Sequence, residues 1–301
     1  MALPAVALPR PRSLGSRIGA LISLTKPRII ELLLITTLPT MIVAQRGLPP
    51  IWLMVATLLG GALAAGGANA INMFVDRDID KLMHRTSKRP LVTGAVTPRA
   101  ALTFAIALEV AAFVELWAWV NLLSAALAVS ATLFYVFVYT LWLKRTSSQN
   151  IVIGGAAGAV PVLVGWAAVT DSLAWTPVVM FAIIFVWTPP HFWALAVKYK
   201  DDYQAANVPM LPAVATLRRT GRDIVLYSLL LVGVSLLLAV VGRLGPIYVV
   251  SASVLGVVFV ALAVRLLRRQ TPAAAMQLFS YSITYLTLLF VLMAVDIFTK
   301  H

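Results

Sequence analysis

The residues from Ile51 to Asp80 read IWLMVATLLGGALAAGGANAINMFVDRDID. The first part, residues 51–73, has no charged side chain and is long enough to cross the ~30 Å of hydrocarbon in a bilayer as an α-helix. Three aspartates, Asp76, Asp78 and Asp80, follow almost directly. The stretch therefore predicts a membrane-spanning helix that ends in an acidic cluster at one membrane surface.

Similar apolar runs recur along all 301 residues, of which 61% are hydrophobic, and the mean hydropathy is +0.93. Because a spanning helix needs about 20 apolar residues, we expect an all-α, polytopic membrane protein. No soluble domain remains outside the spans, so residues 1–301 should form a single transmembrane domain. We predict nine spans, at residues 28–45, 51–73, 99–119, 122–143, 150–169, 176–197, 223–241, 247–264 and 274–298.

The net charge of +13 is distributed very unevenly between the two sides of these spans. Of the 24 Lys and Arg residues, all but Arg46, Arg243 and Lys300 lie on the side that holds the N-terminus. Basic residues favour the cytoplasmic side, so we expect the N-terminus in the cytoplasm and the C-terminus outside. Topology accounts for the charge, and nucleic acid is not an expected partner.

Residues 1–24 are interpreted as a cytoplasmic tail. The first 17 residues carry arginine and no acid, which also suits a transit peptide, but an N-in topology needs basic residues there in any case. We therefore expect a multi-pass protein of the bacterial plasma membrane, with the mitochondrial inner membrane as the alternative. The chain has no cysteine, which excludes disulfides and thiolate catalysis.

Asn72, Asp76 and Asp80 recur every four residues, so on a helix they lie along one face. Like charges on adjacent turns repel, and Mg²⁺ would remove that repulsion because it prefers carboxylate oxygens and often bridges to phosphates. Asp78 falls on the opposite side and is expected to meet solvent or Arg77. The alternative is a solvated acidic helix end that binds no ligand.

Basic residues follow this first cluster in the predicted cytoplasmic loop 75–98. Arg and Lys are suited to phosphate oxygens, so Arg85, Lys88 and Arg89 beside metal-binding carboxylates predict a diphosphate site. The alternative is that these cations only neutralise the acids, at little energetic gain.

The second long loop, 198–222, repeats this chemistry with Asp201 and Asp202, which are flanked by Lys198, Tyr199 and Tyr203. Both loops follow even-numbered spans, so both acid clusters should lie on the cytoplasmic face, where an active-site cavity would open. Taken alone, Asp-Asp-Tyr is a weak signal. Together with Asp76 and Asp80, the pair Asp201 and Asp202 predicts metal ligands in a two-metal clamp on a diphosphate.

The sixth predicted span ends in Trp187-Thr-Pro-Pro-His191-Phe-Trp193. Two prolines are expected to break the helix, and irregular backbone at membrane depth needs protein or a cavity around it. His191 is the only histidine inside a predicted span, and an intramembrane ionisable group is a functional candidate. The alternative is a neutral imidazole bonded to a carbonyl that the prolines leave free.

Aromatic residues crowd the cytoplasmic half of the fourth predicted span. One interpretation is an interfacial belt, which fits Trp142 best. The other is a wall beside an isoprenoid or a developing carbocation, which aromatic faces stabilise. The residues are Phe134, Tyr135, Phe137, Tyr139 and Trp142.

The run Asn72-x3-Asp76-x3-Asp80, followed by Arg85-Thr-x2-Arg89-Pro-Leu, resembles the first aspartate motif of the UbiA-type intramembrane prenyltransferases. Four further stretches, in the same order along the chain, resemble the heme-farnesylating branch of that superfamily. They are Thr25-Lys-Pro-Arg28, Tyr139-Thr-Leu-Trp-Leu-Lys-Arg-Thr146, Trp187-Thr-Pro-Pro-His-Phe-Trp-Ala-Leu-Ala196, and Asp202-Tyr203 with Val208-Pro-Met-Leu-Pro212. The resemblance covers residues 20–300.

Two positions depart from the family pattern. The superfamily shows Asp-x3-Asp as its second motif, whereas Tyr199 and Tyr203 stand there in this chain. That departure resembles the heme-farnesylating branch and leaves open which second-motif oxygens bind metal. Asn207 replaces the usual glycine before Val208, and asparagine tolerates left-handed backbone.

The resemblance implies that farnesyl diphosphate and heme b react to give heme o and diphosphate, for the assembly of heme-copper oxidases. It implies Mg²⁺ as cofactor, membrane lipid as surroundings, and heme-modifying or oxidase-assembly proteins as possible partners. His191 is then a candidate to ligate or orient the heme. The alternatives are prenyl transfer to an aromatic quinone precursor, a membrane transporter, and an assembly scaffold without catalytic activity.

Overall fold

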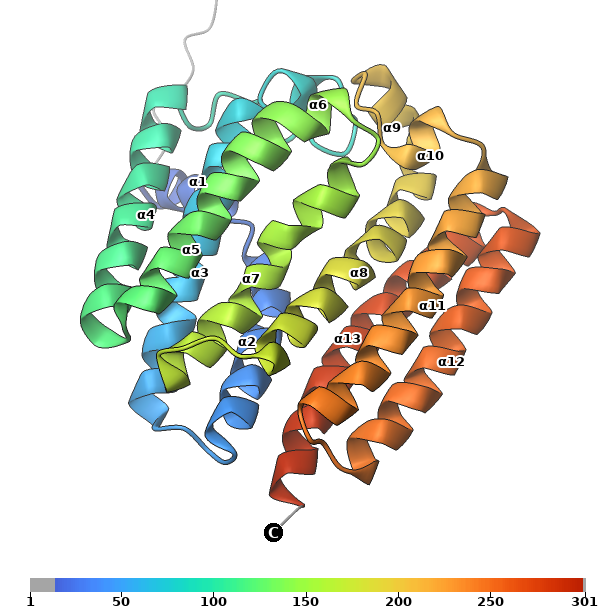
Figure 1. Cartoon of the computed structure of the whole chain (residues 1–301). Coiled ribbons are helices and arrows are strands. Elements are labelled where there is room, and N and C mark those ends of the chain that lie inside the picture. Colours follow the sequence, from blue (N-terminus) through green and yellow to red (C-terminus); the bar gives the residue numbers. More distant parts are fainter. Residues whose placement is uncertain (1–13, 300–301) are drawn as a thin grey trace, which may run out of the picture.

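The computed structural model describes residues 14–299, without the side chains of residues 14, 16, 17 and 28–34. Throughout this range the regular structure is helical and no strand is present (Figure 1). The expected all-α fold is therefore confirmed.

The long helices coincide with the predicted spans. Eight of them are long and apolar enough to cross a membrane, and α2 (Pro27–Gln45) occupies the position of the first predicted span. The total of nine spans and their orientation stay predictions. The eight are α3 (Ile51–Val75), α4 (Pro98–Trp119), the span Leu122–Thr146 that begins with α5 (Leu122–Leu133), α7 (Asn150–Thr170), α8 (Trp175–Lys198), α11 (Leu217–Val241), α12 (Pro246–Arg269) and α13 (Pro272–Phe298).

The helices pack mainly with neighbours in chain order, and α2, α7, α8 and α13 form the middle of the bundle. There α2 contacts both α7 and α13, while α8 contacts α7, α11 and α13 (Figure 1). The largest apolar core lies among α8, α11, α12 and α13. Helices far apart in the chain thus close around a common centre.

Helix α8 is continuous across Pro189 and Pro190, so the predicted break is wrong. Proline removes a backbone hydrogen bond, but neighbouring helices can hold such a helix together in a membrane protein. Both prolines are buried, and the Thr188 hydroxyl donates to the carbonyl of Ile184 at 2.7 Å. Packing on several sides therefore keeps the helix regular.

The fourth predicted span contains a stretch of π-helix, which its sequence does not predict. After α5 the chain winds as a π-helix, η2 (Phe134–Leu143), before α6 (Lys144–Thr146). The Thr140 hydroxyl donates to the carbonyl of Tyr135, five residues earlier, at 2.8 Å. Such wide turns are frequent at functional sites because they re-aim side chains.

The predicted loops and tail hold short helices. The described part of the tail forms α1 (Leu14–Leu24), and residues 1–13 lie outside the described range. Loop 75–98 contains the 3₁₀ turn η1 (Ile79–Lys81). Loop 198–222 contains α9 (Lys200–Ala205) and α10 (Leu211–Val214), and α11 begins at Leu217 rather than at 223.

Candidate active site

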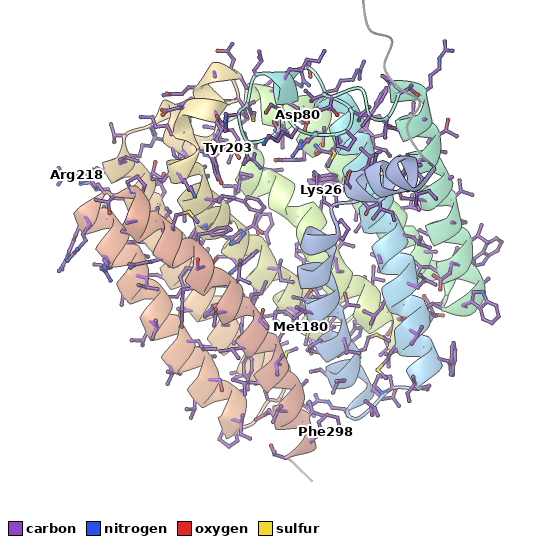
Figure 2. All side chains as sticks on the ribbon, turned by 180° about the vertical axis from the view of Figure 1, so that it is seen from behind. Lys26, Asp80, Met180, Tyr203, Arg218 and Phe298 are labelled. Carbon is purple, nitrogen blue, oxygen red and sulfur yellow. The ribbon has the colours of Figure 1, made fainter. Side chains whose placement is uncertain are left out.

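The two acidic clusters lie at the same end of the bundle. Figure 2 shows Asp80, Tyr203 and Lys26 close to that end, and Phe298 at the opposite end. A small apolar cluster joins the loops beneath the polar residues, with Ile79 and Met83 from one loop and Tyr203 from the other. The expectation that both clusters share one face is confirmed, and its assignment as cytoplasmic stays a prediction.

Asn72, Asp76 and Asp80 are gathered in the interior, with 3%, 0% and 2% of their surfaces exposed. Helix α3 ends at Val75, yet the amides of Asp76 and Asp80 still donate to the carbonyls four residues earlier, each at 2.9 Å. The predicted common face is thereby preserved over one further turn. The Asn72 amide donates to Asp76 Oδ2 at 2.8 Å and to Thr140 Oγ1 at 3.2 Å.

Cations from three other segments surround these oxygens. Lys144 forms an ion pair with Asp76 Oδ2, and Arg89 forms one with Asp80 Oδ2 at 2.6 Å. Lys26, in the connection between α1 and α2, donates to Asn72 Oδ1 at 3.0 Å. Removal from water, helped by nearby Arg89 and Lys144, lowers the pKa of Lys26 to about 7.

Lys26 and Lys144 were not among the predicted site residues. In the sequence, both lysines lie next to predicted spans, where a positive charge indicates the orientation of the span. That position does not indicate which side chain the lysine contacts. Their places in the motifs Thr25-Lys-Pro-Arg28 and Tyr139–Thr146 were the available signal. The side chain of Arg28 lies outside the described residues.

Asp78 points away from the buried group, as expected, but its partner is Arg145 rather than Arg77. Both carboxylate oxygens accept from the Arg145 guanidinium at 2.7 Å, and this pairing lowers the pKa of Asp78 below its ordinary value. Arg77 instead donates to the carbonyl of Phe74 at 2.6 Å. Arg145, in α6, also donates to the carbonyl of Val75 at 3.2 Å, so its guanidinium is held at the end of α3 beside Asp78.

The second cluster is divided between two environments. Asp202 accepts hydrogen bonds from the backbone N–H groups of His84 and Arg85, at 3.2 and 3.1 Å, and so ties the two loops together. Asp201 is exposed. The metal-binding role of both residues stays a prediction.

Arg85 lies over the two tyrosines that replace the second aspartate motif. Its guanidinium carbon is 5.3 Å from the ring centre of Tyr199 and 6.0 Å from that of Tyr203, whose hydroxyl it meets at 3.5 Å. Lys198 lies 5.5 Å from the Tyr199 ring centre. Aromatic faces thus hold cations at the rim, while Lys88 is exposed nearby.

The donor set suits a divalent cation in one respect. Asp76 Oδ1 is buried and accepts no hydrogen bond from any residue in the described range, and Nη2 of the Arg145 guanidinium lies 3.8 Å away, so a ligand at this oxygen would compensate its burial. Within residues 14–299 no three acidic or histidine side chains form a metal cluster by themselves. Mg²⁺ typically uses one or two carboxylates together with water and substrate phosphates, so Asn72, Asp76 and Asp80 fit it.

The π-helix separates the aromatic residues into two groups. Phe137 and Trp142 are 59% and 61% exposed on the outside of the bundle, as a membrane belt requires. Tyr135 and Tyr139 are partly buried and stack at 5.3 Å. Tyr139 packs against Gly154 of α7, where a Cβ would overlap the ring, so the small residue permits this approach.

His191 lies deeper, between α8 and α13. Its Nδ1 is 2.6 Å from the hydroxyl of Ser282, so its partner is a side chain rather than a carbonyl freed by the prolines. Trp187 and Phe279 stack on its ring at centroid distances of 4.2 and 4.7 Å. The residue is 7% exposed.

Fold and site together define an all-helical, multi-pass membrane protein with buried carboxylates among Lys and Arg at one end. The model of the UbiA prenyltransferase family matches residues 33–292. The chain therefore belongs to the UbiA prenyltransferase family, and the resemblance seen in its motifs is confirmed.

Relatives place the chain near one branch of this family. A protoheme IX farnesyltransferase of Renibacterium salmoninarum is 53% identical over 295 residues, which cover 96% of this chain and 93% of that protein. One of Frankia alni is 54% identical over 285 residues, covering 94% of this chain and 99% of that protein.

Two solved structures share the fold. A digeranylgeranylglyceryl phosphate synthase superposes with a TM-score of 0.77 at 16% identity, over 94% of this chain and 99% of that one. A UbiA homologue of Archaeoglobus fulgidus, bound to DMAPP and Mg²⁺, gives 0.66 at 17% identity, over 93% and 99%.

Proposed function

We propose that this protein transfers the farnesyl group of farnesyl diphosphate to a vinyl group of heme b, which gives heme o and diphosphate. The support is the identity of about half of all residues to protoheme IX farnesyltransferases over nearly the whole chain. Membership of a prenyltransferase family also speaks against a transporter or a scaffold.

The chemistry begins at the bond between C1 of the farnesyl chain and the diphosphate oxygen. When it breaks, the electron pair leaves with the diphosphate and an allylic cation remains. The vinyl π electrons attack C1, and the porphyrin-conjugated cation that results takes a hydroxyl from water, which releases a proton. No covalent nucleophile is needed, in keeping with a chain that lacks cysteine.

The cations of the site stabilise the leaving diphosphate. Arg85, Lys88 and Arg89 come from one loop, and Lys26 and Lys144 from two others, so they can surround one polyanion. Positive groups fixed where negative charge grows lower the barrier to bond cleavage. Bound by Asn72, Asp76 and Asp80, Mg²⁺ would add further charge neutralisation at the phosphate oxygens.

The aromatic pair protects the carbocation. Tyr135 and Tyr139 stack within η2. In the same segment the Thr140 hydroxyl accepts from the Asn72 amide and donates to the carbonyl of Tyr135, which connects the pair to the buried carboxylates. Aromatic faces attract a neighbouring positive charge, and their bulk excludes water before the vinyl group attacks.

The single observation that carries this proposal is the identity of about half of all residues to protoheme IX farnesyltransferases, and Asp76 Oδ1, which is buried and accepts no hydrogen bond within the described residues, adds support for a metal beside the diphosphate. We further place the protein in the bacterial plasma membrane, as one transmembrane domain with the site on the cytoplasmic face. Its product would serve heme-copper oxidase assembly. Bacterial relatives and the charge distribution support this placement.

The test supplies membranes containing the protein with heme b and farnesyl diphosphate, with Mg²⁺ or with a chelator, and identifies the extracted heme by chromatography. We expect heme o only with Mg²⁺, and none from Asp76→Asn. Asp171→Asn is the matched control, since Asp171 is exposed and far along the chain from the site. Prenylation of an aromatic quinone precursor instead of heme b would contradict the assignment of heme b as the acceptor.

A further inference from the structure

A hydrogen-bonded pair of buried side chains connects α8 and α13 inside the bundle. His191 Nδ1 and Ser282 Oγ are 2.6 Å apart, and Ser282 is fully buried. The indole N–H of Trp187 also donates to the carbonyl of Ser282, at 2.8 Å. Both residues of this contact therefore lie in regular helices, and the Ser282 end is held to α8 by a further hydrogen bond.

The proton on the Ser282 hydroxyl is already engaged. Ser282 Oγ lies 2.6 Å from the carbonyl oxygen of Phe279, and two oxygens at this distance need a proton between them. A hydroxyl has only one proton, so it donates to Phe279 and accepts at its lone pair. It follows that His191 Nδ1 is the donor to Ser282.

This assignment determines the other ring nitrogen. The imidazole is buried among Trp187, Phe192 and Phe279 and contacts no carboxylate in the described range, so it is neutral. A neutral imidazole protonated at Nδ1 carries a free lone pair at Nε2. Among the side chains that the structure describes, none forms a hydrogen bond with Nε2.

The ring is also held in place. Trp187 and Phe279 lie nearly parallel to it on its faces, with interplanar angles of 20° and 29°. His191 stands seven positions before the end of α8 at Lys198, about 10 Å from that end at 1.5 Å per residue. The free lone pair is thus presented within the apolar interior, at a fixed orientation.

A histidine that ligates a metal typically donates its other N–H to an oxygen, which sets the tautomer and strengthens the ligand. We propose that His191 Nε2 is an axial ligand of the iron of heme b, and that Ser282 is the positioning residue that holds its tautomer. The identity of the metal rests on the proposed function. The arrangement of the ring, its donor bond and its free lone pair comes from this structure alone.

The experiment follows the absorption and electron paramagnetic resonance spectra of purified protein titrated with heme b, without farnesyl diphosphate. We expect the signature of a nitrogen ligand in the unmodified protein. His191→Ala should lose that signature, and added imidazole should restore it. Ser282→Ala should weaken heme affinity by about 10- to 100-fold and shift the spectrum.

Ser228→Ala is the matched control, because Ser228 is equally buried and donates only within its own helix, to Ile224 at 2.6 Å. It should leave the spectrum unchanged. The inference is overturned if His191→Ala keeps the native spectrum and affinity. It is also overturned if Ser282→Ala binds heme b with the same spectrum and affinity as Ser228→Ala.

The outcomes separate this inference from the function beneath it. Asp76→Asn should bind heme b with the native spectrum while making no heme o. If heme b is farnesylated normally but its spectrum is unchanged in His191→Ala, only the assignment of His191 as iron ligand fails. If heme b does not bind at all, the proposed acceptor fails as well.

Discussion

Asp202 accepts a hydrogen bond from the backbone N–H of Arg85 at 3.1 Å, although the two residues are 117 positions apart. The same carboxylate accepts from His84 at 3.2 Å. A single side chain therefore holds the first basic loop against the second acidic loop. Because Arg85 also lies over Tyr199 and Tyr203, this contact sets the position of a cation suited to phosphate.

Asp202→Ala should impair the binding of farnesyl diphosphate. Loss of two hydrogen bonds to a charged group, each of roughly 1.5–3 kcal/mol, would free the loop that carries Arg85. We expect KM for farnesyl diphosphate to rise at least tenfold, measured by heme o formation. Asp202→Asn, which keeps an accepting oxygen, should lose less.

Asp201→Ala is the comparison for this prediction, because Asp201 is the exposed neighbour. We expect a smaller effect than that of Asp202→Ala. An equal or larger loss, relieved by higher Mg²⁺, would instead support the metal-binding role predicted for both residues.

Lys144→Ala should destabilise the protein and make its stability depend on Mg²⁺. Asp76 is fully buried and would keep only the Asn72 amide and the more distant Arg145, so the loss should approach but not exceed the roughly 3–5 kcal/mol of an uncompensated buried carboxylate. A divalent cation that binds the folded state would recover part of this energy. Thermal unfolding of the purified protein, with and without Mg²⁺, measures both effects.

The control for Lys144 is Lys81→Ala, since Lys81 is an exposed lysine of the neighbouring loop. Its unfolding temperature should change little. If Mg²⁺ changes the unfolding temperature of neither Lys144→Ala nor the unmodified protein, Asp76 does not bind the metal.

Gly154→Ala should disturb the aromatic pair. A Cβ at this position overlaps the ring of Tyr139, whereas one at Gly158 meets nothing within 4 Å. Overpacking costs about 1–3 kcal/mol, and displacement of Tyr139 should also lower kcat. Gly158→Ala on the same helix should leave unfolding and turnover nearly unchanged, and equal losses in both variants would refute a specific role for this contact.

The ion pair between Asp78 and Arg145 should add a little stability that acid removes. The pKa of Asp78 in the folded protein lies below its ordinary value of 3.8. The ion pair therefore contributes its full stability above pH 3.8, and this contribution is lost as the pH falls from 3.8 toward the folded-state pKa. Asp78 is 60% exposed, so we expect less than about 1 kcal/mol. Unfolding of Asp78→Asn between pH 6 and pH 3 should show a shallower decline than the unmodified protein.

Most of the architecture could be predicted from local composition. Spans such as α3 and α12 begin and end near the predicted positions, because the transfer of about 20 apolar residues into lipid depends on those residues alone. The left-handed backbone expected at Asn207 is also present, at φ 52°. The predicted break at Pro189 and Pro190 failed, because local rules for proline neglect the packing of neighbouring helices.

By itself, the sequence determined the all-helical class, the joint placement of both acid clusters at one end, and the common face of Asn72, Asp76 and Asp80. Only the tertiary structure decided their partners, Lys144 and Arg89, and the bond between His191 and Ser282. Hydropathy and helical spacing act over a few residues, so they can be read along the chain. A buried charge or imidazole is satisfied by whichever distant helix packs against it, and that is settled only when the bundle closes.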